Sequence, residues 1–247
     1  MSFRQMFRRG FVGCAAIAAI TSRLQIRAGS VVLPLHNALR VAEEWSVVDN
    51  LSQGRVGLSF ASGWHANDFA LMPENYHDRK DVMCRGIEMV RKLWRGETIT
   101  TRNGKGEEIE VRIFPPPLQR DPQLWITAAS NIETFRLAGQ LGTNVLTNLL
   151  GQTVEELASK IVAYREARCE HGYAGAGHVT LMLHAFVGPD LEMVRQTVRT
   201  PFINYLKTST DLVQRARWEF PAFARPQQHV SAPVEDDLTP AELDAIL

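Results

Sequence analysis

Short apolar runs and amphipathic stretches alternate five times along the chain. The runs have the length of β-strands, and the stretches carry apolar residues at the three- and four-residue intervals of a helix. The predicted strands span residues 24–33, 55–61, 124–128, 144–149 and 179–187, and the predicted helices span 38–52, 78–95, 132–141, 153–171 and 189–206. This alternation predicts an α/β fold with a parallel sheet. Periodicity leaves open whether the sheet is doubly wound or part of a closed barrel.

Two segments depart from the repeating pattern. Residues 98–117 alternate on either side of Asn103-Gly104, which predicts a β-hairpin insertion. Residues 11–20 form an apolar block behind a basic stretch, as in a secretory signal. The block has no good small-x-small cleavage site and runs directly into the first predicted strand, so we favour a part of the fold over a signal.

The C-terminal part of the chain is predicted to be less regular. Pro201 is expected to kink or divide the last long helix, because proline removes a backbone hydrogen bond. We predict one domain over residues 1–218, followed by a loosely ordered acidic tail over 219–247 with a short helix after Pro240.

Composition narrows the class of protein. Hydrophobic residues make up 45% and charged residues 22% of the chain, and 27 basic side chains balance 27 acidic ones. This balance gives no support for a nucleic-acid or membrane partner. Three distant cysteines, Cys14, Cys84 and Cys169, fit a reducing compartment, so we predict a cytoplasmic protein. The seven histidines include no pair at metal-ligand spacing on one helix, and no metal is predicted.

Three polar segments follow predicted strands, at the edge where α/β proteins bind ligands. The first is Ala28-Gly29-Ser30, where small residues permit a flat ring to lie on the main chain; a bulge or tight core packing is the simpler explanation. The second is residues 59–69, where a strand ending at Ser62 and Gly63 opens through His65 into a long polar loop. A lone histidine is often only a satisfied hydrogen-bonding group, but a long polar loop in a compact domain is more often functional than not.

The third segment, residues 128–134, runs straight from a strand into a helix. Ser130 and Glu133 have the spacing of a helix capping box. Alternatively, Ser130, Asn131 and Thr134 hold a phosphate together with the free N–H groups of the helix N-terminus. The residues alone do not decide between these two interpretations.

Together these segments resemble a known family. Ala28-Gly-Ser-Val-Val-Leu-Pro-Leu-His36, the run from Arg40 to Arg55, and Ser62-Gly-Trp-His-Ala-Asn-Asp-Phe69 are similar to luciferase-like flavin-dependent monooxygenases. The similarity is greatest to the FMN-dependent branch associated with polyketide and nonribosomal peptide biosynthesis, the mupirocin-pathway type. It covers residues 15–212.

The resemblance implies a TIM barrel and a reaction. Reduced FMN from a separate flavin reductase would react with oxygen and oxygenate a small-molecule or carrier-bound substrate; a deazaflavin is the less expected cofactor. The implied cofactor-binding residues are Gly29 and Ser30, at a non-prolyl cis peptide under the flavin ring, then Ser62 and Gly63, and Ser130, Asn131 and Thr134 at the phosphate. His65 is the implied catalytic candidate.

The same matching implies an incomplete barrel. The first predicted strand here corresponds to the family's third strand and the last to its seventh, so about five βα units are present. Open sheet edges are a liability unless something covers them, and a homodimer through helix 38–52 is one way to do so. A non-catalytic flavin-binding or interaction fragment is the alternative function.

Overall fold

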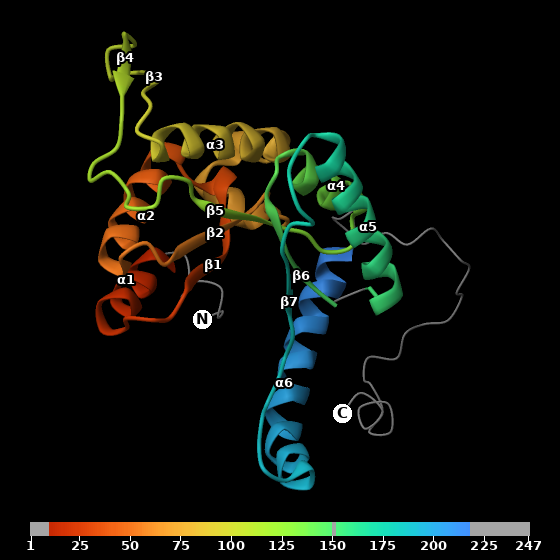
Figure 1. Cartoon of the computed structure of the whole chain (residues 1–247). Helices are drawn as coiled ribbons and strands as arrows, with labels where there is room; N and C mark the ends of the chain where they lie inside the picture. Colours follow the sequence, from red (N-terminus) through yellow and green to blue (C-terminus); the bar gives the residue numbers. More distant parts are fainter. Residues whose placement is uncertain (1–9, 150–151, 218–247) are drawn as a thin grey trace. The chain divides into compact units, whose positions relative to one another are not determined.

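The computed structural model describes residues 10–149 and 152–217. Its centre is a five-stranded parallel sheet in the order β1-β2-β5-β6-β7 (Figure 1). The strands are β1 (Ile26–Val32), β2 (Val56–Ala61), β5 (Gln123–Thr127), β6 (Asn144–Asn148) and β7 (Val179–Met182). Spatial order follows chain order without a reversal, whereas a doubly wound sheet reverses at its switch point. The sheet is therefore a segment of a barrel wall, and the predicted α/β barrel class is confirmed.

Helices connect successive strands, as the periodicity predicted. They are α2 (Ala38–Ser52), α3 (Arg79–Trp94), α4 (Ile132–Gln140) and α5 (Val154–Glu170). The capping box at the start of α5 is also confirmed: Thr153 Oγ1 accepts from the N–H of Glu156, and the Glu156 carboxylate accepts from the N–H of Thr153. The predicted and observed bounds of these helices agree closely, because the apolar spacing and the capping or glycine residues at the helix ends indicate the same limits.

The two faces of the sheet differ in their packing. Leu58, Phe60, Ile126 and Val145 are fully buried in one hydrophobic core together with residues of the covering helices. The opposite face holds Trp125, and a Cβ at Gly57 would come within 2.7 Å of the Trp125 ring. Glycine at position 57 therefore makes room for this indole on the inner face of the barrel wall.

The hairpin insertion consists of β3 (Ile99–Arg102) and β4 (Glu108–Val111), paired antiparallel. The predicted hairpin is confirmed, but its turn is not a tight Asn-Gly turn. Arg102 pairs with Glu108, and the loop closes through a 2.9 Å hydrogen bond from the N–H of Asn103 to the carbonyl of Glu107. Gly106, with φ of +83°, supplies the left-handed residue that this longer loop needs.

The apolar block at residues 11–20 forms a helix, α1 (Gly10–Ile20), that the sequence analysis did not predict. It packs against α2 and β1, with Ala18 buried. Arg55, next to β2, binds the end of this helix. Its guanidinium donates to the carbonyl oxygens of Ala18, Thr21 and Leu24, and its Nε donates to that of Ser52 at 2.6 Å.

We expect Arg55→Met to lower the free energy of unfolding by about 2 kcal/mol, because several half-buried carbonyl groups lose a charged donor. The methionine keeps most of the apolar stem, so the loss reports the hydrogen bonds. Urea unfolding followed by circular dichroism measures the change. Arg23→Met, at an exposed arginine before β1, is the matched control and should have little effect. Equal unfolding midpoints for the two variants would show that Arg55 does not hold α1.

Two predictions about the C-terminal elements are wrong in their bounds. The strand predicted over 179–187 ends at Met182, because its pairing partner β6 ends at Asn148, which lies opposite Met182. The helix predicted to end near residue 206 is α6 (Leu191–Arg217). Pro201 lies inside it without dividing it, and the helix continues past residue 206 to Arg217.

Among the described residues the chain divides into two compact units at the boundary between Met182 and Leu183. In the second unit the ring of His184 lies 4.5 Å from that of Tyr205 on α6. The predicted boundary at residue 218 falls at the edge of the described part and stays a prediction. The tail over 219–247 and its short helix lie outside that part. No helix in the described ranges combines the length and apolarity needed to cross a bilayer.

Candidate functional site

The three predicted ligand segments lie at the carboxyl ends of β1, β2 and β5. These strands are adjacent in the sheet, so the structure brings the segments to one edge of the barrel wall. Neighbouring parallel strands are about 4.8 Å apart, so the first and third segments are separated by roughly 10 Å. An elongated ligand lying across the strand ends could contact all three.

Gly29 and Ser30 lie in β1, and the peptide bond between them is cis, as the resemblance implied. Gly29 pairs with Ser59 and Val31 pairs with Phe60, so Ser30 is an extra, bulged residue. Both residues are exposed, and a Cβ at Gly29 would lie 3.2 Å from Leu146 Cδ2 on β6. The bulge interpretation is therefore confirmed, and the bulge leaves open main chain on the inner face.

Ser62 and Gly63 follow the end of β2. Gly63 has φ of +81°, and a Cβ there would come within 2.9 Å of the Phe69 ring and of Val32 Cγ1. Glycine is required at this position for both conformation and space. Gly63 therefore lets the chain turn from β2 directly onto the end of β1.

His65 lies two residues further on and precedes a 3₁₀ helix, η3 (Ala66–Leu71). Its Nδ1 is buried and has no hydrogen-bond partner among the described residues, and its ring meets Trp64 edge-on at 5.7 Å. The predicted long loop is thus ordered by η3 and by η4 (Pro73–Asn75). Asn75 Nδ2 anchors it to the carbonyl oxygen of Pro34 at 2.8 Å.

The third segment forms the start of α4, and the Ser130–Glu133 capping box, one of the two alternatives left open, is not formed. Asn131 is the cap: its Oδ1 accepts from the N–H of Glu133 at 2.9 Å, and its backbone is extended (φ −82°, ψ 114°). The helix starts one residue later than a Ser130 cap requires. Ser130 and Thr134 add hydroxyl groups at this helix N-terminus, a donor set that fits a phosphate group.

One polar pair in this region escaped the sequence analysis. Ser59 Oγ and Thr127 Oγ1 lie 2.7 Å apart and join β2 to β5. Thr127 is opposite Leu146 in the sheet register, on the same face as Gly29. Hydrophilic residues at alternating positions in otherwise apolar strands were the available signal. This pair makes the inner face polar next to the bulge.

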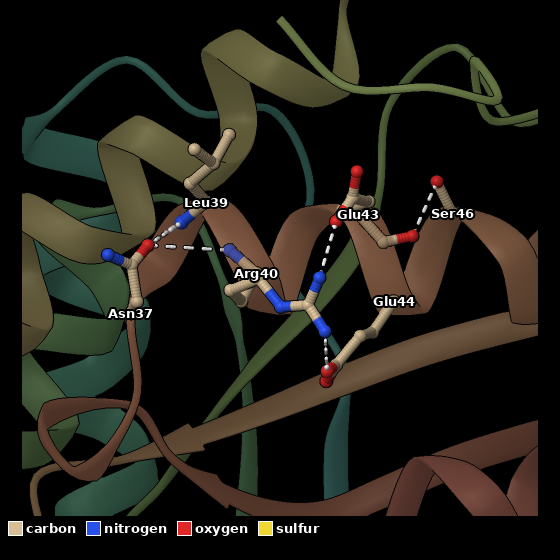
Figure 2. A network of polar contacts seen from close by, with 6 residues as sticks. All are labelled: Asn37, Leu39, Arg40, Glu43, Glu44 and Ser46. Atoms are coloured by element: carbon tan, nitrogen blue, oxygen red, sulfur yellow. Dashed lines mark hydrogen bonds and ion pairs between the residues drawn. The ribbon is translucent and has the colours of Figure 1, made fainter. Parts of the chain in front are cut away.

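The helix after β1 begins with a polar network (Figure 2). Asn37 Oδ1 accepts from the N–H groups of Leu39 and Arg40, and the Arg40 guanidinium contacts Glu43 at 3.0 Å and Glu44 at 3.3 Å. Burial lowers the pKa of the neighbouring His36, and the charge of Glu44 opposes this effect. The imidazole of His36, which follows β1 in the chain, is therefore neutral at neutral pH.

These features define a class of protein: an α/β-barrel protein with polar segments gathered at three adjacent strand ends. Histidine, cysteine and carboxylate side chains form no group suited to a metal ion in the described ranges. The family model for luciferase-like monooxygenases matches residues 2–246. The chain belongs to the luciferase-like monooxygenase family, and the resemblance at the family level is confirmed.

Curated relatives match part of the chain. The alkanal monooxygenase alpha chain of Photobacterium leiognathi is 24% identical over 163 residues, 66% of this chain and 46% of the relative. The oxygenase component of a flavin-dependent trigonelline monooxygenase from Acinetobacter baylyi is 25% identical over 206 residues, 79% of this chain and 55% of the relative. The chain spans about half the length of these curated relatives.

Solved structures share the fold. The monooxygenase RslO1 from Streptomyces bottropensis has a TM-score of 0.70 at 22% identity and covers 83% of this chain and 64% of its own. The oxygenating constituent of 3,6-diketocamphane monooxygenase from Pseudomonas putida, in complex with FMN, has a TM-score of 0.65 at 16% identity. The match covers 77% of this chain and 57% of that protein. An F420-dependent secondary alcohol dehydrogenase has a TM-score of 0.63 at 19% identity, and the match covers 76% of this chain and 58% of the dehydrogenase chain.

Proposed function

We propose that the chain is the flavin-binding part of a monooxygenase that uses reduced FMN and oxygen. The observation that carries this proposal is the meeting of two surfaces at one sheet edge: open main chain at Gly29 and Ser30, and phosphate donors at the start of α4. The first surface would hold the flavin ring, and Ser130, Asn131 and Thr134 would hold its phosphate. Ser62 and Gly63 border the ring.

When bound, reduced FMN would supply the two electrons for oxygen activation, so that one oxygen atom goes to the substrate and the other leaves as water. The side chains and backbone of this chain would position the flavin and the substrate, and they would provide a group for proton transfer. The backbone turn at Gly63 sets the place of His65, which is the titratable side chain that we assign to proton transfer near the substrate. Its buried, unpartnered Nδ1 supports this assignment, because a committed structural histidine would have a partner there.

Relatives support the cofactor and partner assignments. One similar structure holds FMN and another depends on F420, a deazaflavin; we propose FMN. A relative described as an oxygenase component supports a separate flavin reductase as partner. The proposed substrate is a small-molecule or carrier-bound intermediate of polyketide or nonribosomal peptide biosynthesis, and the proposed location is the cytoplasm. Because β1 and β7 each have one neighbour in the sheet of the described residues, flavin binding without turnover is the second candidate.

The phosphate assignment predicts that Ser130→Asp weakens FMN binding at least about tenfold, by like-charge repulsion at the helix N-terminus. Titration of flavin fluorescence quenching measures the dissociation constant. Riboflavin, which has no phosphate, should bind the variant and the wild type equally.

Gln140→Asp is the matched control, because it adds the same charge to an exposed position at the other end of α4. Equal losses of FMN and riboflavin affinity in Ser130→Asp would place the phosphate elsewhere. Absence of saturable quenching of FMN by the wild type up to high micromolar concentrations would refute the flavin site as a whole.

A further inference from the structure

The loop between β2 and α3 forms an open depression of about 490 Å³. Its lining residues all come from η3, η4 and the residue that follows them: Ala66, Asn67, Phe69, Ala70, Pro73 and Tyr76. No charged side chain contributes to this lining. Two side chains offer hydrogen bonds, the amide of Asn67 and the hydroxyl of Tyr76. The lining is otherwise apolar, as in most small-molecule sites.

The aromatic wall of this depression is held in place from both sides. Phe69 is buried and meets Tyr76 edge-on, with ring centroids 5.1 Å apart. The Arg79 guanidinium lies 4.9 Å from the centroid of the Tyr76 ring, and its Nη1 donates to the Tyr76 carbonyl oxygen at 2.8 Å. With the Asn75 anchor to Pro34, these contacts fix the wall before any ligand arrives.

The depression borders the candidate flavin site. The Phe69 ring that lines it also packs on Gly63, which we place beside the flavin ring. The helix η3, which supplies four of the lining residues, begins immediately after His65. Gly63 and His65 do not line the depression themselves, so it adjoins the proposed cofactor site through the Phe69 ring and the proposed proton site through Ala66.

We propose that this depression binds the substrate, and that the substrate is an uncharged ring compound with a carbonyl or hydroxyl oxygen. This proposal rests on the proposed function, because a ligand in the depression is a substrate only if the neighbouring site binds flavin. Aromatic walls favour a ring, and the Asn67 amide and Tyr76 hydroxyl favour an oxygen-bearing group. None of the lining side chains carries a charge to pair with an ionised ligand, and the Arg79 guanidinium contacts the outer wall through the Tyr76 ring and carbonyl oxygen.

Two fluorescent probes of equal ring system test the charge preference. At pH 7, 2-naphthol is neutral and 2-naphthoate is anionic, and the fluorescence anisotropy of each reports binding. We expect the protein to bind 2-naphthol at least tenfold more tightly than 2-naphthoate. Equal affinities, or no saturable binding of 2-naphthol, would overturn the proposal.

Two variants of the same short helix test the location. Ala70→Asp places a carboxylate in the lining at an exposed position, and we expect it to weaken 2-naphthol binding at least tenfold. Leu71→Asp adds the same charge next to it at an exposed residue outside the lining, and should leave 2-naphthol binding unchanged. Equal effects of the two substitutions would overturn the assignment to the depression.

An FMN titration of the same preparations separates this inference from the proposed function. FMN binding without a preference for 2-naphthol overturns the substrate class and leaves the flavin site standing. The preference for 2-naphthol without FMN binding supports the depression as a ring-compound site and overturns the flavin function.

Discussion

Gly139→Val is expected to prevent the normal packing of α4 on α5. A Cβ at position 139 would lie 2.4 Å from the carbonyl oxygen of Tyr164 and 2.8 Å from the backbone nitrogen of Arg168. Backbone atoms inside a helix cannot move aside as a flexible side chain can, so the two helices would have to separate. Overpacking of this kind costs about 3 kcal/mol or more. Urea unfolding followed by circular dichroism should show a large fall in the midpoint.

A second helical glycine provides the control for this experiment. Gly13 lies in α1, and a Cβ there would meet no atom within 4 Å. Gly13→Ala should therefore stabilise the protein by up to about 1 kcal/mol through helix propensity, whereas Gly139→Ala should destabilise it in spite of the same propensity gain. If both alanine variants unfold at or above the wild-type midpoint, Gly139 does not set the approach of the helices.

Elements with both periodicity and end signals were predictable from the sequence. The helix α2 has apolar residues on one face, Asn37 at its start and Gly54 beyond its end, and its observed bounds equal the predicted ones. Periodicity could not predict the order of the strands, because sheet order depends on contacts between segments distant in the sequence. The family resemblance, carried by local motifs, correctly indicated a barrel.

Where prediction failed, a tertiary contact had decided the local structure. The helix α1 is apolar on all sides, so it shows no amphipathic period, and Arg55 binds its end from more than thirty residues away. The strand β7 ends where its partner ends. At the candidate site, the residue types around Ser130 were found from the sequence, but two adjacent cap residues compete there and only the backbone angles select Asn131.

Asp49→Asn is expected to loosen the connection between the hairpin and β5. Asp49 is fully buried in α2, and its carboxylate accepts three hydrogen bonds: from the N–H of Leu118 at 2.7 Å, from the N–H of Gln119 at 3.0 Å, and from the Gln119 side-chain amide at 2.7 Å. Gln119 in turn donates to the carbonyl of Val56 and accepts from the Trp94 indole through its own carbonyl. The Asp49 carboxylate thus ties α2 to the segment that follows the hairpin, and Gln119 in that segment in turn binds β2 and α3.

An asparagine at position 49 keeps the shape but replaces one acceptor oxygen with a donor. Whichever way its amide turns, it faces at least one part-buried N–H group that then loses its acceptor, and the charge that strengthened all three bonds is lost. Hydrogen bonds to charged groups contribute about 1.5–3 kcal/mol each, so we expect a loss of about 3 kcal/mol in the free energy of unfolding. Glu43→Gln, at a partly exposed carboxylate of the same helix that contacts Arg40 at the surface, should change stability by less than about 0.5 kcal/mol. Hydrogen exchange provides the local test: faster exchange at the amides of Leu118 and Gln119 is expected in Asp49→Asn, and unchanged protection there would show that the carboxylate does not hold this segment.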